Sequence, residues 1–301
     1  MATLVRTVKE FKDDKLQHWA AALTYYSVLS LFPALLVMVA LVGLFANPDT
    51  VTRFLTDVVA ALGPETAVDT FKGPIESVTA NRGAAGILAI VGVASALWSA
   101  SGYVGAFTDA SNTIYEVDEG RPFWKLKPLQ LFVTFVCISL VAVTALALVI
   151  SGPLATAVGD ALGLGDVAVT AWQFGKWPIM LLLVLLILHV LYFMSPNARV
   201  SGKWISPGAV LTLVVWIVAS VAFAFYVANF GSYNKTYGTM GGVVVFLLWL
   251  WLTNIAVLLG VEFNAEIERT REIKRGVPGA REELKLPERD RPKQKQRPST
   301  A

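Results

Sequence analysis

The side chains of this sequence that could do chemistry are few, and most stand alone within long apolar stretches. The candidates for a cavity lining or a substrate contact are Tyr26, Ser30, Pro33, Ser95, Ser99, Asn112, His189, Lys235, Tyr237, Asn254 and Glu262. Ionisable groups in apolar surroundings are functional candidates because burying their charge is costly. If these side chains converge in the folded chain, they form a polar cavity inside an otherwise apolar protein.

Glu262 and His189 are the strongest ionisable candidates. Glu262 falls at the end of the last apolar stretch, where a carboxylate needs a partner, and we expect that partner to be Lys203 or Arg269. The neutral imidazole of His189 avoids most of the cost of burial, so two interpretations stay open. It makes either a structural hydrogen bond to a neighbouring helix or a step in a proton relay.

Helical spacing places other polar residues on common faces. Tyr26, Ser30 and Pro33 are separated by four and three residues and therefore share one face of a helix. Pro33 is expected to kink that helix. A second stripe steps by three or four residues through Gly92, Ser95, Ser99, Gly102, Ala106, Asp109 and Asn112. Small residues at this spacing indicate either close helix packing in a membrane or the lining of a polar path.

Apolar helices must position these residues. The chain has 301 residues, of which 55% are hydrophobic and only 16% charged. Crossing about 30 Å of hydrocarbon takes about 20 helical residues, and the long uncharged stretches of this sequence are sufficient for that. Backbone groups within a bilayer must be bonded inside the protein, so such stretches are helices. The sequence predicts an all-α, polytopic membrane bundle with about six spans, over residues 19–46, 84–108, 129–151, 177–194, 207–229 and 241–262.

The distribution of Lys and Arg predicts the orientation. If six helices alternate sides, 20 basic residues fall on the side that holds both termini, and 5 fall on the other. Without the C-terminal tail the ratio is still 9 to 5. Because cytoplasmic loops carry the excess of positive charge, both termini are predicted to be cytoplasmic. The expected location is a bacterial inner membrane, crossed several times.

Three segments flank or interrupt the transmembrane domain, which is expected to cover residues 19–274. Residues 1–18 are amphipathic and predict a helix on the inner membrane surface. No cleavable signal peptide is recognised there, so the first span is expected to remain as an anchor. Residues 49–83 predict external amphipathic helices. Residues 275–301 are rich in Pro, Lys, Arg, Gln and Glu and predict a basic, disordered cytoplasmic tail.

Several function classes receive no support from the sequence. The lone Cys137 cannot form an intrachain disulfide, and two histidines provide no metal-binding motif. No cofactor, metal or nucleic-acid partner is expected. A ribonuclease would need a metal cluster or an acid–base pair at a water-accessible site. Only Glu262 and Glu266 offer paired carboxylates, so ribonuclease activity is not favoured, and we expect that the chain is not an enzyme.

Several motifs occur together in a fixed order. In the second half these are Tyr192-Phe193-Met194-Ser195-Pro196-Asn197, Lys203-Trp204-Ile205-Ser206-Pro207-Gly208-Ala209, Lys235-Thr236-Tyr237-Gly238 and Leu259-Gly260-Val261-Glu262-Phe263-Asn264. The first half adds Ala20-Ala21-Ala22-Leu23-Thr24-Tyr25-Tyr26, Leu31-Phe32-Pro33 and Asn112-Thr113-Ile114-Tyr115. In order and spacing, over about residues 10 to 270, the chain resembles the YihY/virulence factor BrkB family of bacterial membrane proteins.

The resemblance implies a six-helix inner-membrane protein, in agreement with the charge distribution. It also implies a link to envelope integrity and to transport of lipids or other envelope components, and some members carry a ribonuclease BN label. Pro196-Asn197 is expected to end the fourth helix and Pro207-Gly208 to begin the fifth. Lys235 and Tyr237 act either as turn residues at the outer face or as substrate contacts.

Two functions follow as hypotheses. The first is a transporter or flippase for a lipid-like or envelope-related substrate. The second is a non-transporting scaffold that docks envelope-assembly proteins through the external segment and the basic tail. Membrane lipids are the expected partners in both cases, with a homo-oligomer as an open alternative. The sequence names neither the substrate nor an energy source.

Overall fold

The computed structural model describes residues 2–45, 84–149, 155–156, 159, 165–200, 205–229 and 239–291. Within them the long elements are all helices: α1 (Ala2–Asp13), α2 (Leu16–Phe45), α5 (Ala84–Ile114), α6 (Phe123–Val149), α8 (Asp166–Met194), α9 (Pro207–Asn229) and α11 (Thr239–Lys274). Every described residue of the six predicted spans lies within one of these helices. The predicted all-α class is therefore confirmed.

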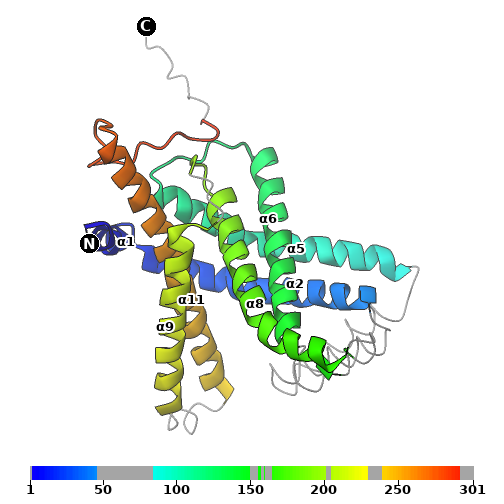
Figure 1. Ribbon diagram of the computed structural model, residues 1–301. Coiled ribbons are helices and arrows are strands. Elements are labelled where there is room, and N and C mark those ends of the chain that lie inside the picture. The colour runs from blue at the N-terminus through cyan, green and yellow to red at the C-terminus, as the bar shows by residue number, and fades with distance from the viewer. Residues whose placement is uncertain are drawn as a thin grey trace.

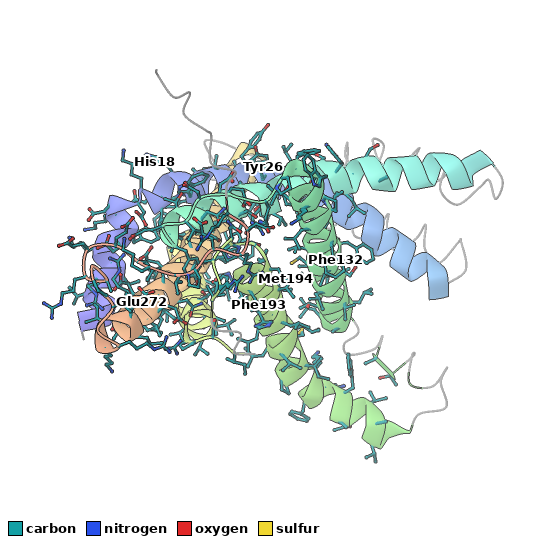
Figure 2. All side chains as sticks on the ribbon, turned by 90° about the horizontal axis from the view of Figure 1, so that it is seen from above. His18, Tyr26, Phe132, Phe193, Met194 and Glu272 are labelled. Atoms are coloured by element: carbon teal, nitrogen blue, oxygen red, sulfur yellow. The ribbon has the colours of Figure 1, made fainter. Side chains whose placement is uncertain are left out.

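Within the part of the chain that the structure describes in full, four helices are long and apolar enough to cross a membrane: α6, α8, α9 and α11. In Figure 1 α6 and α8 form one pair and α9 and α11 form another, whereas α2 and α5 lie together and run across them. Figure 2 shows the same pairing of α2 and α5 from above. The structure thus supports a helical membrane protein, and the count of six crossings stays a prediction.

One end of the helical assembly gathers most of the charged segments. We call it the charged end, and it comprises α1, residues 115–122 between α5 and α6, residues 195–200 after α8, and the C-terminal part of α11 with residues 275–291. Figure 1 shows these segments together near the N-terminus, and Figure 2 places His18 and Glu272 there. The grouping agrees with the prediction that these segments share one side of the membrane.

Glycines allow α9 and α11 to approach closely at this end. A Cβ atom on Gly208 would lie 2.0 Å from the carbonyl oxygen of Gly260, and one on Gly260 would lie 1.9 Å from Thr212 Oγ1. A Cβ atom at either position would therefore clash, so the helices can approach this closely only because both residues are glycines. Asn264 Oδ1 then accepts a hydrogen bond from the Gly208 backbone N–H at 2.8 Å. Because that N–H lies in the first turn of α9, it has no partner within its own helix.

The tail differs from its prediction. The sequence indicates disorder from Gly276, yet residues 276–291 return along the charged end, where Ala280 and Leu284 are buried. Ala198 and Glu288 form an isolated antiparallel bridge, and the Arg199 backbone N–H donates to the Pro287 carbonyl at 2.9 Å. Disorder is therefore wrong for this part of the tail, because its backbone finds partners on the loop after α8. The remaining residues, 292–301, lie outside the described part.

The N-terminal helix is confirmed, but its contacts differ from a purely membrane-facing helix. Thr7 and Phe11 are buried against the protein, while Val5 and Val8 are exposed. Lys15 has a φ of 54°, in the left-handed region, at the turn that separates α1 from α2. The helix therefore packs on α11 through one face and leaves the apolar side chains of Val5 and Val8 exposed.

Candidate functional site

A hub of hydrogen bonds around Asn197 organises the charged end. Asn197 is 0% exposed. Its Nδ2 donates to the carbonyl oxygens of Asp118 at 2.7 Å and Asp290 at 2.8 Å, and its Oδ1 accepts from the Asp290 N–H at 3.1 Å. Its own N–H donates to Asn112 Oδ1 at 2.7 Å. Through its side chain and its backbone N–H, this one buried residue therefore joins α5, the loop after it, the end of α8 and the tail.

This hub explains two predicted features. Asn112, a cavity candidate, is buried and also donates through Nδ2 to Glu119 Oε2 at 3.0 Å. The Pro196-Asn197 motif does follow the end of α8, as expected. Its larger role, to hold the tail, could not be read from the sequence because the partner residues lie about 80 to 90 positions away.

A second buried network joins the apolar helices. Tyr192 Oη donates to the Val257 carbonyl at 2.6 Å and lies 2.7 Å from Thr212 Oγ1. Asn254 Nδ2 donates to Thr24 Oγ1 at 3.2 Å, and Asn254 Oδ1 accepts from the Tyr103 hydroxyl at 3.0 Å. Asn254 thus connects α11 to α2 and α5, and its amide is fully used in structural bonds.

The ion pairs of the charged end meet on α11. Arg6 Nε donates to Glu266 Oε2 at 2.6 Å, which ties α1 to α11. Arg269 donates through a terminal nitrogen to Glu116 Oε1 at 2.6 Å. Its Nε lies 2.9 Å from Glu266 Oε1, an ion pair without hydrogen-bond geometry. Glu116 also accepts from the Leu284 N–H at 2.8 Å. Each of these acids therefore has a basic partner.

Glu262 is different. It lies one turn before Glu266 on the same face of α11 and is 2% exposed, yet its Oε2 atom has no hydrogen-bond partner. The acids that act on it electrostatically are Asp14, Glu266 and Glu10, and the base is Arg269. Of the two expected partners, Lys203 lies outside the described residues. Arg269 is engaged by Glu116 and Glu266, so the expected bond to Glu262 is not formed through Oε2.

Asp14 lies at the outer edge of this group, in the turn between α1 and α2. Its partial burial, together with the carboxylates of Glu10 and Glu116, raises its pKa to about 6, against the opposing effect of Arg269. The group of acids and bases around Glu262 is hereafter the α11 charge cluster; its members are Arg6, Glu10, Asp14, Glu116, Glu262, Glu266 and Arg269.

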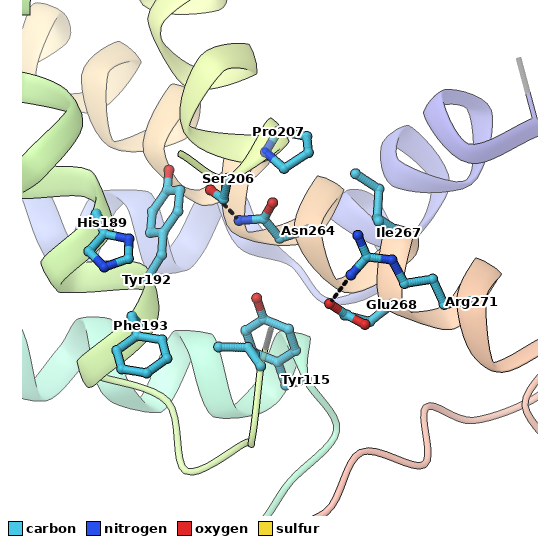
Figure 3. Close-up of a pocket in the computed structure, with 11 residues that line it drawn as sticks. Tyr115, His189, Tyr192, Phe193, Ser206, Pro207, Asn264, Ile267, Glu268 and Arg271 are labelled. Atoms are coloured by element: carbon cyan, nitrogen blue, oxygen red, sulfur yellow. Dashed lines mark hydrogen bonds and ion pairs between the residues drawn. The ribbon is translucent and has the colours of Figure 1, made fainter. Parts of the chain in front are cut away.

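A small pocket lies beside the cluster (Figure 3). It is lined by Tyr115, His189, Tyr192, Phe193, Val200, Ser206, Pro207, Asn264, Ile267, Glu268 and Arg271. Its volume of about 30 Å³ has room for a water molecule or two but not for a lipid. His189 stacks on Phe193 with ring centroids 5.7 Å apart. The pocket therefore places His189 next to polar groups without forming a substrate cavity.

A second, larger hollow is lined in part by Glu116. It has a volume of about 740 Å³. Its lining is acidic and consists of Trp19, Asp109, Asn112, Thr113, Glu116, Val117, Asp118, Glu119, Glu283 and Glu288. Glu116 belongs to both the hollow and the α11 charge cluster, so the two are joined through one side chain.

The remaining candidates that the structure describes line neither space. Ser95 and Ser99 are exposed, because the buried face of α5 is shifted by about one position and carries Ala100, Ser101 and Val104 instead. Ser95 and Ser99 therefore line neither of the two spaces, and a polar path along this stripe stays a prediction. Close helix packing does occur further along this stripe, at Gly102, which lies against Tyr26 of α2.

Tyr26 and Ser30 take part in packing and local bonding on α2. A Cβ atom on Gly102 would lie 2.9 Å from the Tyr26 ring, so Tyr26 fills the space that this glycine leaves. Ser30 Oγ donates to the Ser27 carbonyl of its own helix at 2.8 Å. The side chain of Pro33 lies outside the described residues, and so do Lys235, Tyr237 and the segment 49–83.

No metal site is found within the described part of the chain: no group of three or more His, Cys, Asp or Glu side chains there could hold a metal ion.

The fold and the cluster define a helical membrane protein with a buried ionic group at one end. The chain belongs to the virulence factor BrkB family, whose family model matches residues 7–284. It is similar to a putative ribonuclease-like protein, YfkH, of Bacillus subtilis, with 31% identity over 85% of this chain and 92% of the relative. A UPF0761 membrane protein of Alteromonas mediterranea is 25% identical over 86% of this chain and 85% of the relative.

The family also contains longer chains. A UPF0761 membrane protein of Neisseria meningitidis is 26% identical over 86% of this chain, which spans 62% of that relative. No solved structure matches the chain. The expected family resemblance and membrane character are therefore confirmed, while the printed names of the relatives assign no substrate.

Proposed function

We propose that the protein is a transporter or flippase for a lipid-like or envelope-related substrate, and that the α11 charge cluster is part of its machinery. The observation that carries the proposal is the buried Glu262 carboxyl whose Oε2 atom has no partner. A protein that only had to fold would be as stable or more so with an apolar side chain here. Ionisable groups in such positions mark substrate and ion pathways in membrane proteins.

The charged end predicts how the protein is oriented in the membrane. Its segments hold most of the Lys and Arg residues of the chain. Because positively charged loops remain on the cytoplasmic side, we place the charged end in the cytoplasm of a bacterium and the chain in its inner membrane. The acidic hollow and the cluster then face the cytoplasmic leaflet, with six crossings of the membrane as the sequence predicts.

The lining of the hollow favours one class of substrate. Six of its ten lining residues are Asp or Glu, and Trp19 is also present. Carboxylates repel a bare phosphate and attract an amine or ammonium group, to which an aromatic face adds a favourable cation–π contact. We therefore expect a lipid-like substrate whose headgroup carries a positive charge, rather than a purely anionic one.

The test is a flipping assay with the purified full chain in vesicles of phosphatidylethanolamine and phosphatidylglycerol. A trace of fluorescent phosphatidylethanolamine or fluorescent phosphatidylglycerol is added, and dithionite bleaches the outer leaflet. We expect protein-dependent loss of the protected half of the signal, faster for the ethanolamine lipid. Flipping of neither lipid above the level of protein-free vesicles contradicts the proposal, and equal rates contradict the headgroup preference.

A scaffold that docks envelope-assembly proteins is the second candidate, and the fixed position of residues 276–291 favours it. These residues present a constant surface that includes the exposed Arg281. Deleting the tail from Gly276 is a poor test because it also removes the buried Leu284 and the partners of Asn197. Arg281→Glu is a better one. If the protein is a scaffold, this variant should cause an envelope defect in cells while flipping in vesicles is unchanged. If it is a transporter, the variant should leave both the envelope and the flipping unchanged.

A ribonuclease activity is not part of the proposal. The ribonuclease-like name belongs to the Bacillus relative, and it reaches this chain only through similarity of sequence. Incubation of the purified protein with labelled RNA tests the point, and degradation that Glu262→Gln abolishes would overturn our assignment of Glu262 to transport.

A further inference from the structure

We propose that Glu262 is a proton-binding site and that its proton is the coupling ion of the protein. The site is inferred from the geometry of the α11 charge cluster alone. Only the coupling rests on the transport function proposed above.

The surroundings of Glu262 select a proton as its ligand. The residue is 2% exposed, and Oε2 lies in the protein without a hydrogen-bond donor. An ionised carboxylate is unfavourable in such a place, whereas a neutral carboxylic acid costs far less.

The charges that face Glu262 come from three directions. Its own helix contributes Glu266 and Arg269, α1 contributes Glu10, and the turn after α1 contributes Asp14. Three acids therefore oppose one base. A buried Tyr115, just beyond α5, also interacts with Glu262 electrostatically.

Arg269 does not neutralise Glu262 by itself. It is held by Glu116 at 2.6 Å and lies 2.9 Å from Glu266, so its charge is shared among carboxylates that already pair with it. Arg6 reaches the same group only through Glu266 and Thr270. Both arginines of the cluster are thus paired with other carboxylates, and a charge on Glu262 would add to an excess of acids.

Asp14 provides the connection to water. It is partly exposed, and it is the charged group that acts most strongly on Glu262. Because its pKa is raised to about 6, it gains and loses a proton close to neutral pH. A proton that leaves Glu262 therefore has an acceptor at the protein surface. Movement of α1, which carries Glu10 and is tied to α11 by Arg6, would change how readily this exchange occurs.

Infrared difference spectroscopy tests the site without reference to transport. The full chain in vesicles is titrated with acid and base, and the C=O stretch of protonated carboxyl groups is followed. We expect a band that persists at neutral pH and that Glu262→Gln removes. Glu268→Gln is the matched control because it lies on the same helix and is paired with Arg271, so the band should remain. An unchanged band in Glu262→Gln overturns the site.

Sodium is the competing occupant and is tested in the same sample. Exchange of choline chloride for sodium chloride at constant pH should leave the band unaltered. A sodium-dependent loss of the band, absent from Glu262→Gln, assigns the site to sodium and overturns the proton assignment.

A pH gradient across vesicles that contain fluorescent phosphatidylethanolamine tests the coupling. One proton per lipid shifts the ratio of the probe between leaflets by up to about tenfold for each pH unit. Flipping that ignores the gradient overturns the coupling while the proposed function stands. A band from Glu262 without any flipping overturns the proposed function while the proton site stands.

Discussion

Two buried polar side chains at the charged end, Asn197 and Glu262, are satisfied in opposite ways. Asn197 uses both atoms of its amide and its backbone N–H to join segments that are far apart in sequence. Glu262 is almost as buried, but Oε2 has no partner, and Arg269 of the same cluster is already paired with Glu116 and Glu266. The first arrangement serves folding. The second contributes little to folding, and we therefore assign it to function.

The largest expected effect on stability is that of Asn197→Ala. The variant leaves the carbonyls of Asp118 and Asp290 and the N–H of Asp290 without their partner. Each buried group left unpaired costs about 1 to 3 kcal/mol, so we expect a loss of about 3 to 5 kcal/mol. Thermal unfolding of the purified protein, followed by tryptophan fluorescence, measures it. An unchanged melting temperature would show that the hub is not needed for folding.

The next effect is that of Gly260→Ala, at the contact of α9 with α11. The new Cβ would lie 1.9 Å from Thr212 Oγ1 and 2.6 Å from the Gly208 carbonyl, so the helices must separate. Overpacking of this kind costs about 1 to 3 kcal/mol.

Gly175→Ala is the matched control for this variant. No atom lies within 4 Å of its new Cβ. Since Ala is favoured over Gly within a helix by about 1 kcal/mol, the control should be neutral or slightly stabilising. Equal melting temperatures for the two variants would contradict a close approach of α9 and α11.

A smaller effect is expected at Asp14 and depends on pH. The pKa of Asp14 is raised from 3.8 to about 6 in the folded protein, so the folded state binds the proton more tightly than the unfolded state. Its contribution to stability is fully present below about pH 4 and is lost as the pH rises through about 6. Because the group is partly screened by water, we expect a loss of about 1 kcal/mol.

The variant Asp14→Asn should remove this part of the pH dependence. Melting curves between pH 4 and pH 7 then show a shallower decline for the variant than for the wild type. Asp13→Asn, one residue earlier and exposed, serves as the control. Identical pH profiles for all three proteins would mean that Asp14 is not influenced by the cluster.

Glu262→Gln should have the smallest effect on stability. The amide keeps the size of the side chain and removes the ionisable group, so no ion pair of the cluster is lost. We expect a shift in melting temperature below about 1 °C, which corresponds to less than about 1 kcal/mol for a chain of this size. A large destabilisation would place Glu262 with Asn197 among the residues that serve folding.

Much of the fold could be predicted from the sequence, because long uncharged stretches must be helical in a bilayer. The start of α9 at Pro207 agrees with the sequence prediction. The buried tail was missed, because Leu284 and Leu286 are isolated apolar residues among charges. Their burial depends on bonds to Asn197 and Glu116, which no local pattern reveals.

The candidate site was predicted in part. Glu262 was identified because an acid at the end of an apolar stretch is conspicuous. Its surroundings were not, since the charges from Glu10 and Asp14 reach it only when α1 folds back on α11. The exposure of Ser95 and Ser99 could not be predicted, because small residues do not show which side of a helix is buried.

The most direct test of the account is the flipping of fluorescent phosphatidylethanolamine by Glu262→Gln, beside Glu268→Gln and the wild type, in matched vesicles. All three proteins should reconstitute equally and melt at similar temperatures. The account predicts that Glu262→Gln loses most of the flipping activity while Glu268→Gln retains it. Full activity in Glu262→Gln would contradict the claim that this buried acid is kept for transport.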